Sequence, residues 1–166
     1  MILEDLREEF AKKQNEIVIK RRAGKFSNEN DDIAEQKSVW DWYKAEEYKI
    51  TGNNSSIISE AKSRATSKFD ELRKKCFWEN TLTIDDLKLK TLEIFNDYED
   101  ELLNFGLKIQ KIKNKDDFIS KAITILEKFS KNKKKAQLVE SDNDLCGLLA
   151  IIVKQYFDEV ENGKST

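Results

Sequence analysis

Apolar residues recur at every third or fourth position along most of this chain, the spacing that places side chains on one face of an α-helix. The clearest stretch is 56–78, whose apolar positions are Ile58, Ala61, Ala65, Phe69, Leu72 and Cys76. Polar and charged residues fill most of the positions between them. The pattern therefore predicts an all-α protein whose helices each bury one apolar face.

Interruptions of this pattern divide the chain into five to six helices. Residues that favour helix starts and ends stand at these interruptions, and Ser141 is expected to cap the last helix. The first helix includes Ile17–Ile19, a β-branched stretch that also suits a short strand, but no partner strand is visible and we expect helix. The predicted helices cover residues 2–22, 29–51, 56–78, 83–112, 116–131 and 142–161.

Two of these helices are expected to organise the bundle. Thr83 and Asp86 form a shortened capping box. The apolar row that follows runs to Ile112, which gives a fourth helix roughly 45 Å long unless it bends at Gly106. In the last helix the stretch 145–153 is apolar on all sides, which is typical of the middle of a bundle. The predicted fold is an irregular helical bundle with a long central fourth helix and a buried C-terminal helix.

The length of the chain, 166 residues, suits one domain. We expect a single helical domain over residues 1–166 that unfolds as one cooperative unit. A break near residues 80–83 would divide this domain into two sub-layers, 1–80 and 83–163.

Composition narrows the function, because the chain has no proline and no histidine. Proline costs about 3 kcal/mol inside a helix, so its absence suits long helices. Histidine is the commonest general base and metal ligand near neutral pH, so its absence removes most familiar catalytic sites. We therefore expect a protein that is not an enzyme and that holds no cofactor.

The two cysteines, Cys76 and Cys146, have neither metal-ligand spacing nor a disulfide framework. Each stands among apolar neighbours, which indicates buried free thiols in a reducing compartment. The acidic segment 1–10 lacks the apolar core of a signal peptide. The longest apolar run, 145–153, is far shorter than the ~20 residues that span a bilayer. These observations predict a cytoplasmic protein without a membrane partner.

Charge is nearly balanced overall but unevenly distributed. The formal net charge is −2, so bulk charge does not indicate a nucleic-acid partner. Residues 104–136 contain ten lysines and three acids, whereas the flanking stretches 85–103 and 137–166 are acidic. We interpret this alternation mainly as mutual neutralisation between packed helices. Glu93 and Asp97 have a spacing that a magnesium site could use, but in a chain so rich in acids they are more typical of a solvated helix face.

Two basic clusters keep a nucleic-acid-binding accessory role as the alternative function. Arginine binds phosphate oxygens with two parallel hydrogen bonds, so the cluster that contains arginine is the sharper candidate. Apart from Phe26, no aromatic residue accompanies either cluster, which weakens the case for stacking on single-stranded bases. The first cluster is Lys20, Arg21, Arg22 and Lys25, and the second is Lys131, Lys133, Lys134 and Lys135.

The tryptophans of the second predicted helix carry the leading hypothesis. On a helical wheel Trp40 shares a side with Ile33, whereas Trp42 lies about 160° away. Either this helix packs between two layers, or Trp42 faces solvent and anchors a protein interface, as exposed tryptophans often do. The candidate partner-binding residues are Val39, Asp41, Trp42 and Lys44. The predicted function is a non-catalytic protein-binding module, such as an immunity or inhibitor protein or a small accessory subunit of a bacterial or phage complex.

Overall fold

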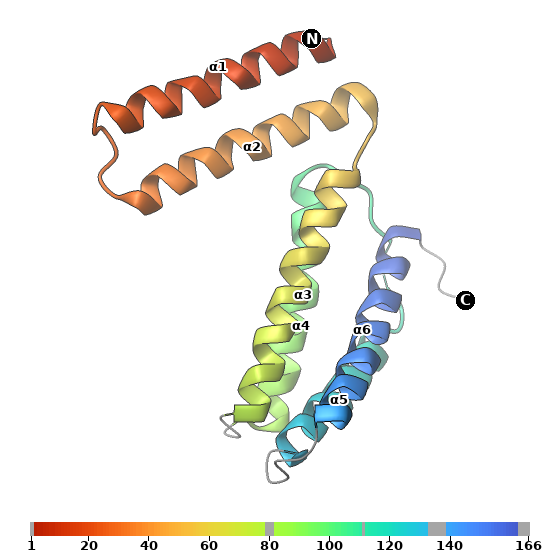
Figure 1. The fold of residues 1–166 in the computed structure, drawn as a ribbon. Helices are drawn as coiled ribbons and strands as arrows, with labels where there is room; N and C mark the ends of the chain where they lie inside the picture. Colours follow the sequence, from red (N-terminus) through yellow and green to blue (C-terminus); the bar gives the residue numbers. More distant parts are fainter. Residues whose placement is uncertain (1, 79–81, 111, 133–138, 163–166) are drawn as a thin grey trace. The chain divides into compact units, whose positions relative to one another are not determined.

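The computed structural model describes residues 2–78, 82–110, 112–132 and 139–162, and of 130–132, 139–143 and 162 it describes the backbone alone. This part of the chain contains helices and connecting segments without any strand, which confirms the predicted all-α class. The helices in Figure 1 are α1 (Leu3–Arg22), α2 (Glu29–Thr51), α3 (Ser55–Trp78), α4 (Ile84–Asn104), α5 (Lys115–Asn132) and α6 (Val139–Asn162).

The chain divides into two compact units, Met1–Ile58 and Ser59–Thr166. The first unit contains α1 and α2, and the second contains most of α3 and all of α4, α5 and α6. The break that the sequence suggests near residues 80–83 lies inside the second unit. Cooperative unfolding of the whole chain as a single domain stays a prediction.

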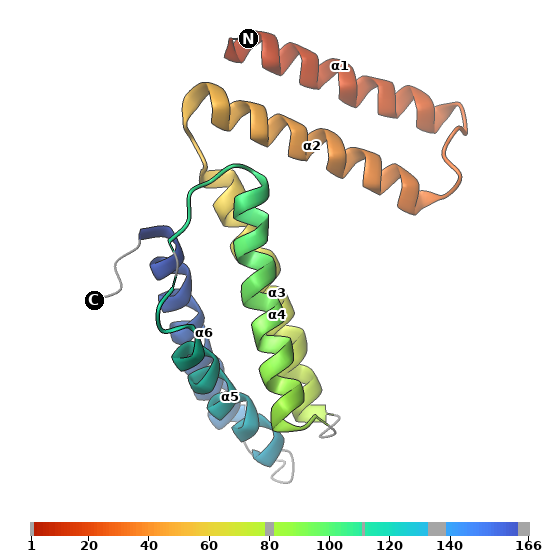
Figure 2. The same ribbon diagram turned by 180° about the vertical axis from the view of Figure 1, so that it is seen from behind.

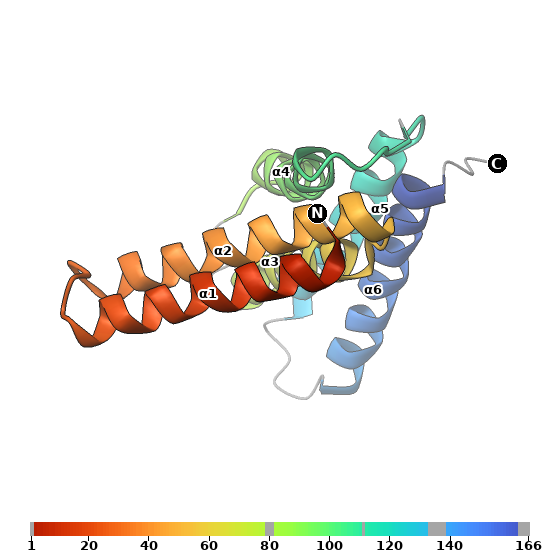
Figure 3. The ribbon, with the colours of Figure 1, turned by 90° about the horizontal axis from the view of Figure 1, so that it is seen from above.

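The first unit is a helical hairpin, in which α1 and α2 lie side by side (Figures 1 and 3). Gly24 ends α1 in the left-handed conformation (φ 68°), and its N–H donates to the carbonyl of Arg21 at 3.1 Å. Asn28 caps α2, because its side-chain oxygen accepts a hydrogen bond from the Asp31 N–H at 2.9 Å. The predicted start and end of these two helices are confirmed to within one residue, and Ile17–Ile19 is helical as expected.

The hairpin has a small core. In α1 only Leu6 and Ile17 are buried. An aromatic cluster adds to them, with the ring of Phe10 centred 4.5 Å from that of Tyr43, which stacks in turn on Trp40 at 5.7 Å.

The fourth helix is shorter than the sequence suggests. Its start is as predicted, with Thr83 and Asp86 forming a reciprocal capping box. It ends at Asn104, however, because Gly106 adopts a φ of 84° and closes a Schellman motif. In that motif the N–H of Leu107 donates to the carbonyl of Leu102 at 3.1 Å, and the side chains of both residues are buried. The predicted helix through Ile112 is therefore wrong.

The core of the second unit is aromatic. The rings of Phe95 on α4 and Tyr156 on α6 stack with centroids 3.8 Å apart, and Phe69 of α3 packs against Phe95 at 5.4 Å. Tyr98 and Phe157 join them at 4.6 Å. Helix α5 packs closely against both α4 and α6, as Figure 2 shows from behind. These contacts hold α4, α5 and α6 together around a closed apolar centre.

The last helix begins at Val139, so Ser141 lies inside it and is not its N-cap. Its inner side is buried, but Leu148 and Ile151 remain 47% and 55% exposed. The prediction that 145–153 would be covered on all sides is therefore wrong in this respect. Among the described residues, no helix combines the length and apolar character that crossing a bilayer requires.

Candidate functional site

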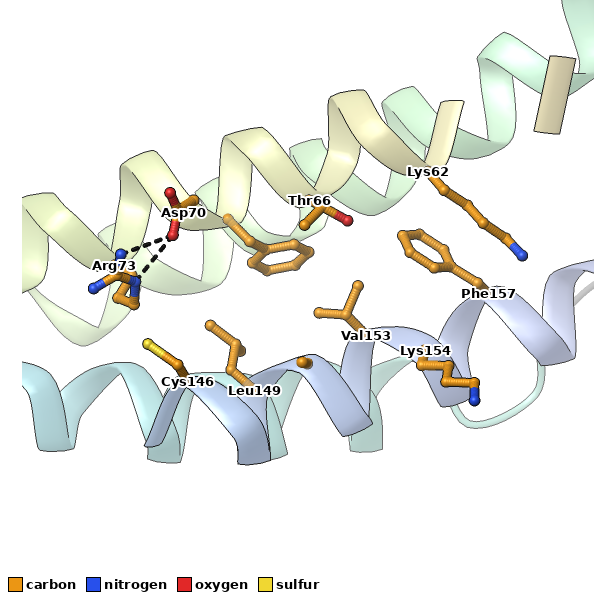
Figure 4. Close-up of a pocket in the computed structure, with 11 residues that line it drawn as sticks. Lys62, Thr66, Asp70, Arg73, Cys146, Leu149, Val153, Lys154 and Phe157 are labelled. Carbon is orange, nitrogen blue, oxygen red and sulfur yellow. Dashed lines mark hydrogen bonds and ion pairs between the residues drawn. The ribbon is translucent and has the colours of Figure 1, made fainter. Parts of the chain in front are cut away.

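A groove of about 430 Å³ lies between α3 and α6 (Figure 4). The two helices run in opposite directions, so that Lys62 lies near Phe157 at one end and Arg73 lies near Cys146 at the other. The floor is apolar, and its side chains are only 3–5% exposed. They are Phe69, Leu149, Val153 and Phe157.

The backbone of α3 does not pack closely against the other helices of its unit, which leaves the groove open. Contacts between side chains connect α3 to those helices. Two ion pairs join α3 to α4, one between Arg64 and Glu101 and one between Lys68 and Asp97 at 3.0 Å. The basic helix α3 therefore neutralises part of the acidic α4, a pairing that the sequence analysis did not anticipate. A third pair, Lys115 with Glu99 at 2.5 Å, joins 104–136 to 85–103 as expected from the charge alternation.

Ion pairs lie at both ends of the groove. At the Arg73 end the guanidinium lies 2.8 Å from Asp70, and it also lies over the ring of Phe129 at 5.6 Å. At the other end Lys62 pairs with Glu161 at 2.6 Å. The exposed Lys154 also lines this end, and Figure 4 shows its side chain directed away from α3. The groove therefore has an ion pair at each end.

The outer face of α6, which we define as Gly147, Leu148 and Ile151, is apolar and exposed. No charged residue occurs between Leu145 and Val153. Exposed leucines also occur on α4, but there acids such as Glu93 and Asp97 stand among them. An uncharged, exposed apolar helix face is typical of a surface that contacts another molecule.

The thiols differ in burial. Cys76 is fully buried on α3, as expected, whereas Cys146 is half-buried and lines the groove. The prediction of a buried thiol is therefore wrong for Cys146. Neither forms a disulfide.

A buried polar network lies behind the groove. The Tyr156 hydroxyl lies 2.7 Å from Glu99 Oε2 and 3.0 Å from the carbonyl of Phe95, and Lys115 pairs with the same carboxylate. Burial, and then the hydrogen bond to Glu99, raises the pKa of Tyr156 above its usual value of 10. Burial likewise raises the pKa of Tyr98. Both groups stay protonated at neutral pH, which suits a structural role.

The structure places the predicted partner-binding residues of α2 on the hairpin. Trp42 is half-buried, and Nζ of Lys13 on α1 lies 4.9 Å from its ring centroid. Asp41 pairs with Lys37 at 2.9 Å, and Val39 is half-buried. Lys44 is only 2% exposed and lies 3.4 Å from Asp41, so its ammonium is not presented to solvent as the hypothesis of an exposed surface assumed. Partner binding at this surface stays a prediction.

Carboxylates of α2 compensate half of the first basic cluster. Lys20 pairs with Glu35 at 2.8 Å, and Arg21 holds Asp32 at 2.5 and 3.0 Å. The guanidinium lowers the pKa of Asp32 to about 2, mainly through this hydrogen bond, with a second one from Gln36. Arg22 and Lys25 form no ion pair with a described residue. Only these two remain available to meet phosphates.

The second basic cluster, Lys131, Lys133, Lys134 and Lys135, lies outside the residues whose side chains the structure describes. Asp97 is 59% exposed and pairs with Lys68, which agrees with a solvated helix face. Within the described ranges, no three histidine, cysteine, aspartate or glutamate side chains gather as a metal site would require.

The outer face and the groove were missed as sites because apolar residues at helical spacing look like core. The signal was present in α6, whose centre has more apolar sides than one packing surface can cover. No protein-family model, curated protein or solved structure matches this chain.

Proposed function

We propose that this chain is a non-catalytic protein-binding module, such as an immunity or inhibitor protein or a small accessory subunit of a bacterial or phage complex, and that it binds its partner through the outer face of α6. The observation that carries the proposal is the exposure of Leu148 and Ile151, at 47% and 55%, in a stretch without any charge.

Burial of such side chains favours association. Covering a leucine or isoleucine contributes about 1.5–3 kcal/mol relative to full exposure, so two half-exposed residues supply a substantial part of a specific contact. Their spacing, three residues apart, places them next to each other on one helix face. Gly147 stands beside them without a side chain, which lets a partner approach the helix closely. The absence of histidine from the sequence supports the non-catalytic part of the proposal.

The surface of α2 is a second candidate contact for the same function. Trp42 is half-buried and could still supply an edge of its indole to a partner. Replacing Trp42 by alanine tests this: loss of partner capture with an unchanged helical circular dichroism signal assigns the contact to α2, whereas unfolding shows that the residue belongs to the hairpin core.

The test of the α6 proposal is site-specific photo-crosslinking. A benzophenone amino acid is placed at Ile151, and the matched control carries it at Leu89, which is 62% exposed on α4. In extract from cells of the natural source, we expect one defined adduct from position 151 and none of that mass from position 89. The same adduct from both positions, or from neither, contradicts the proposal.

A further inference from the structure

A second groove, of about 580 Å³, lies between α1 and α2 along one side of the hairpin, and we call it the hairpin groove. Its lining is largely apolar, and the hairpin itself covers these side chains only in part. Ile33 on α2 is 54% exposed, and Val18 on α1 is half-buried. Phe10 and Trp40, whose ring centroids lie 5.9 Å apart, are half-buried as well. On this side the two helices therefore do not close a core.

The groove side of the hairpin is large enough for a specific contact. Helix α1 has 20 residues and is therefore about 30 Å long, and two adjacent helices are about 20 Å wide. This side has a flat area of about 600 Å², and the relief of the side chains makes its accessible area larger. A standard interface covers about 800 Å² on each partner. Because two helices alone supply little core, covering this side would also stabilise the hairpin.

The charged residues that line the hairpin groove already have partners on the hairpin. Arg21 pairs with Asp32 at 2.5 Å, and Lys37 pairs with Asp41 at 2.9 Å. The other polar residues of the lining are glutamines, which carry no charge. Two copies of this side therefore meet without repulsion between like charges, and an acidic or basic partner gains little from it.

The charges of α1 make this helix complementary to a second copy of itself. Residues 3–11 contain four acids and one arginine, whereas residues 12–22 contain five basic residues and one acid. When two copies of α1 lie antiparallel, the acidic half of each helix lies next to the basic half of the other. Charge complementarity of this kind sets the orientation of a contact more than its affinity. It indicates a second copy of this chain as the molecule that covers the hairpin groove.

We propose that this chain forms a homodimer through the groove side of its hairpin, with α1 antiparallel to α1 of the second copy. The two hairpins form a four-helix arrangement that covers Phe10, Ile33 and Trp40 of both copies. The two-fold symmetry makes the same patch of each copy the contact surface, so every substitution in it acts twice. Neither Trp42 nor the outer face of α6 lines this groove, so dimerisation goes beyond the proposed function.

Analytical ultracentrifugation of the full chain tests the dimer. At about 100 µM it should sediment as a dimer, because contacts of this size have micromolar or tighter affinity. Ile33→Glu should raise the dimer Kd about hundredfold, since it places two acids in the contact and removes two apolar side chains. Ile19→Glu is the matched control at a position of α1 that is 58% exposed and outside the groove, and it should leave the Kd unchanged. Circular dichroism should show the same helical signal for both variants.

Disulfide trapping tests the antiparallel arrangement. Gln14 lines the groove near the middle of α1, so in an antiparallel pair it lies close to its counterpart in the second copy. Gln14→Cys should therefore give a disulfide-linked dimer on oxidation. Glu16→Cys, exposed on the same helix but outside the groove, should not. Both variants also carry Cys146→Ser, and the remaining thiol, Cys76, is fully buried.

Any of four results overturns the proposal. They are a monomeric chain at the same concentration, an unchanged Kd for Ile33→Glu, loss of the dimer in Ile19→Glu with the helical signal retained, and trapping at position 16 that equals or exceeds trapping at position 14. None of them bears on the crosslinking experiment at Ile151, which detects a different protein in an extract. The homodimer and the partner contact of α6 are thus tested separately.

Discussion

Replacing Tyr156 by phenylalanine isolates the hydroxyl of the buried network. The ring of Tyr156 is fully buried and stacks on Phe95, and phenylalanine keeps that contact. What is lost is the hydrogen bond of the hydroxyl to the Glu99 carboxylate at 2.7 Å, together with its contact of 3.0 Å to the carbonyl of Phe95. A hydrogen bond to a charged group contributes about 1.5–3 kcal/mol. Glu99 is 16% exposed and keeps Lys115 as a partner, so we expect a loss near the lower end, about 1.5–2 kcal/mol.

Tyr98 provides the matched control. It is as deeply buried as Tyr156, but its hydroxyl forms no hydrogen bond of good geometry with a described residue; the nearby carboxylate of Glu161 only contributes to raising its pKa. Removing an unsatisfied buried hydroxyl is nearly neutral or stabilising, so Tyr98→Phe should change the free energy of unfolding by less than about 0.5 kcal/mol.

Urea unfolding, followed by circular dichroism, measures both variants against the wild type, and the dependence on urea should keep its slope. Equal costs for the two variants would refute the assignment of the stabilising hydrogen bond to Tyr156 and Glu99.

Three further outcomes follow from the ionisable groups of this protein. The pKa of Tyr156 is raised in the folded protein, so its contribution to stability is complete below pH 10 and declines as the pH rises further. Tyr156→Phe should therefore reduce the loss of unfolding free energy at alkaline pH. An unchanged loss at alkaline pH contradicts this. Because Arg21 lowers the pKa of Asp32 to about 2, the contribution of this pair is complete above the usual aspartate value of 3.8 and is lost as the pH falls toward 2. Asp32→Asn should remove that part of the acid transition in thermal unfolding from pH 5 to 2, and a profile parallel to the wild type would count against the pair. Since two cations of the first basic cluster are already paired, we expect no mobility shift of DNA or RNA at about 50 mM salt, where phosphate contacts are strong; a salt-sensitive shift would favour the nucleic-acid alternative.

Local signals in the sequence predict most helix boundaries correctly. Asn28 and Thr83 have side chains that accept the first free N–H groups of a helix, and both are caps in the structure. Gly106 shows the limit of such signals. A glycine costs about 1 kcal/mol in a helix interior, and it is favoured at the end of a helix in a Schellman motif. The apolar row continues on both sides of Gly106, so the sequence alone leaves open whether the helix continues or ends there. Leu107 is buried once the helices have packed, and this burial, which favours the Schellman motif, depends on tertiary structure.

The candidate site depends on which helices face each other, and periodicity does not encode this. Phe69 and Leu149 belong to regular apolar rows, and the sequence alone cannot distinguish a closed contact between two rows from an open groove. Lys44 illustrates the opposite case: a lysine predicted at a surface is buried beside Asp41. The excess of apolar sides around 145–153 predicted a helix buried on all sides, but the same pattern fits a helix that has more apolar surface than its own unit covers.

The most direct test of the protein-binding account compares the affinity of the crosslinked partner, once isolated, for two charge variants. Ile151→Glu places an acid in the outer face of α6, and Leu89→Glu makes the same change at a similarly exposed position of α4. We expect Ile151→Glu to raise the Kd about thirtyfold, as loss of a central anchor does, and Leu89→Glu to leave it unchanged. An unchanged Kd for Ile151→Glu, with the helical signal retained, would contradict binding through α6.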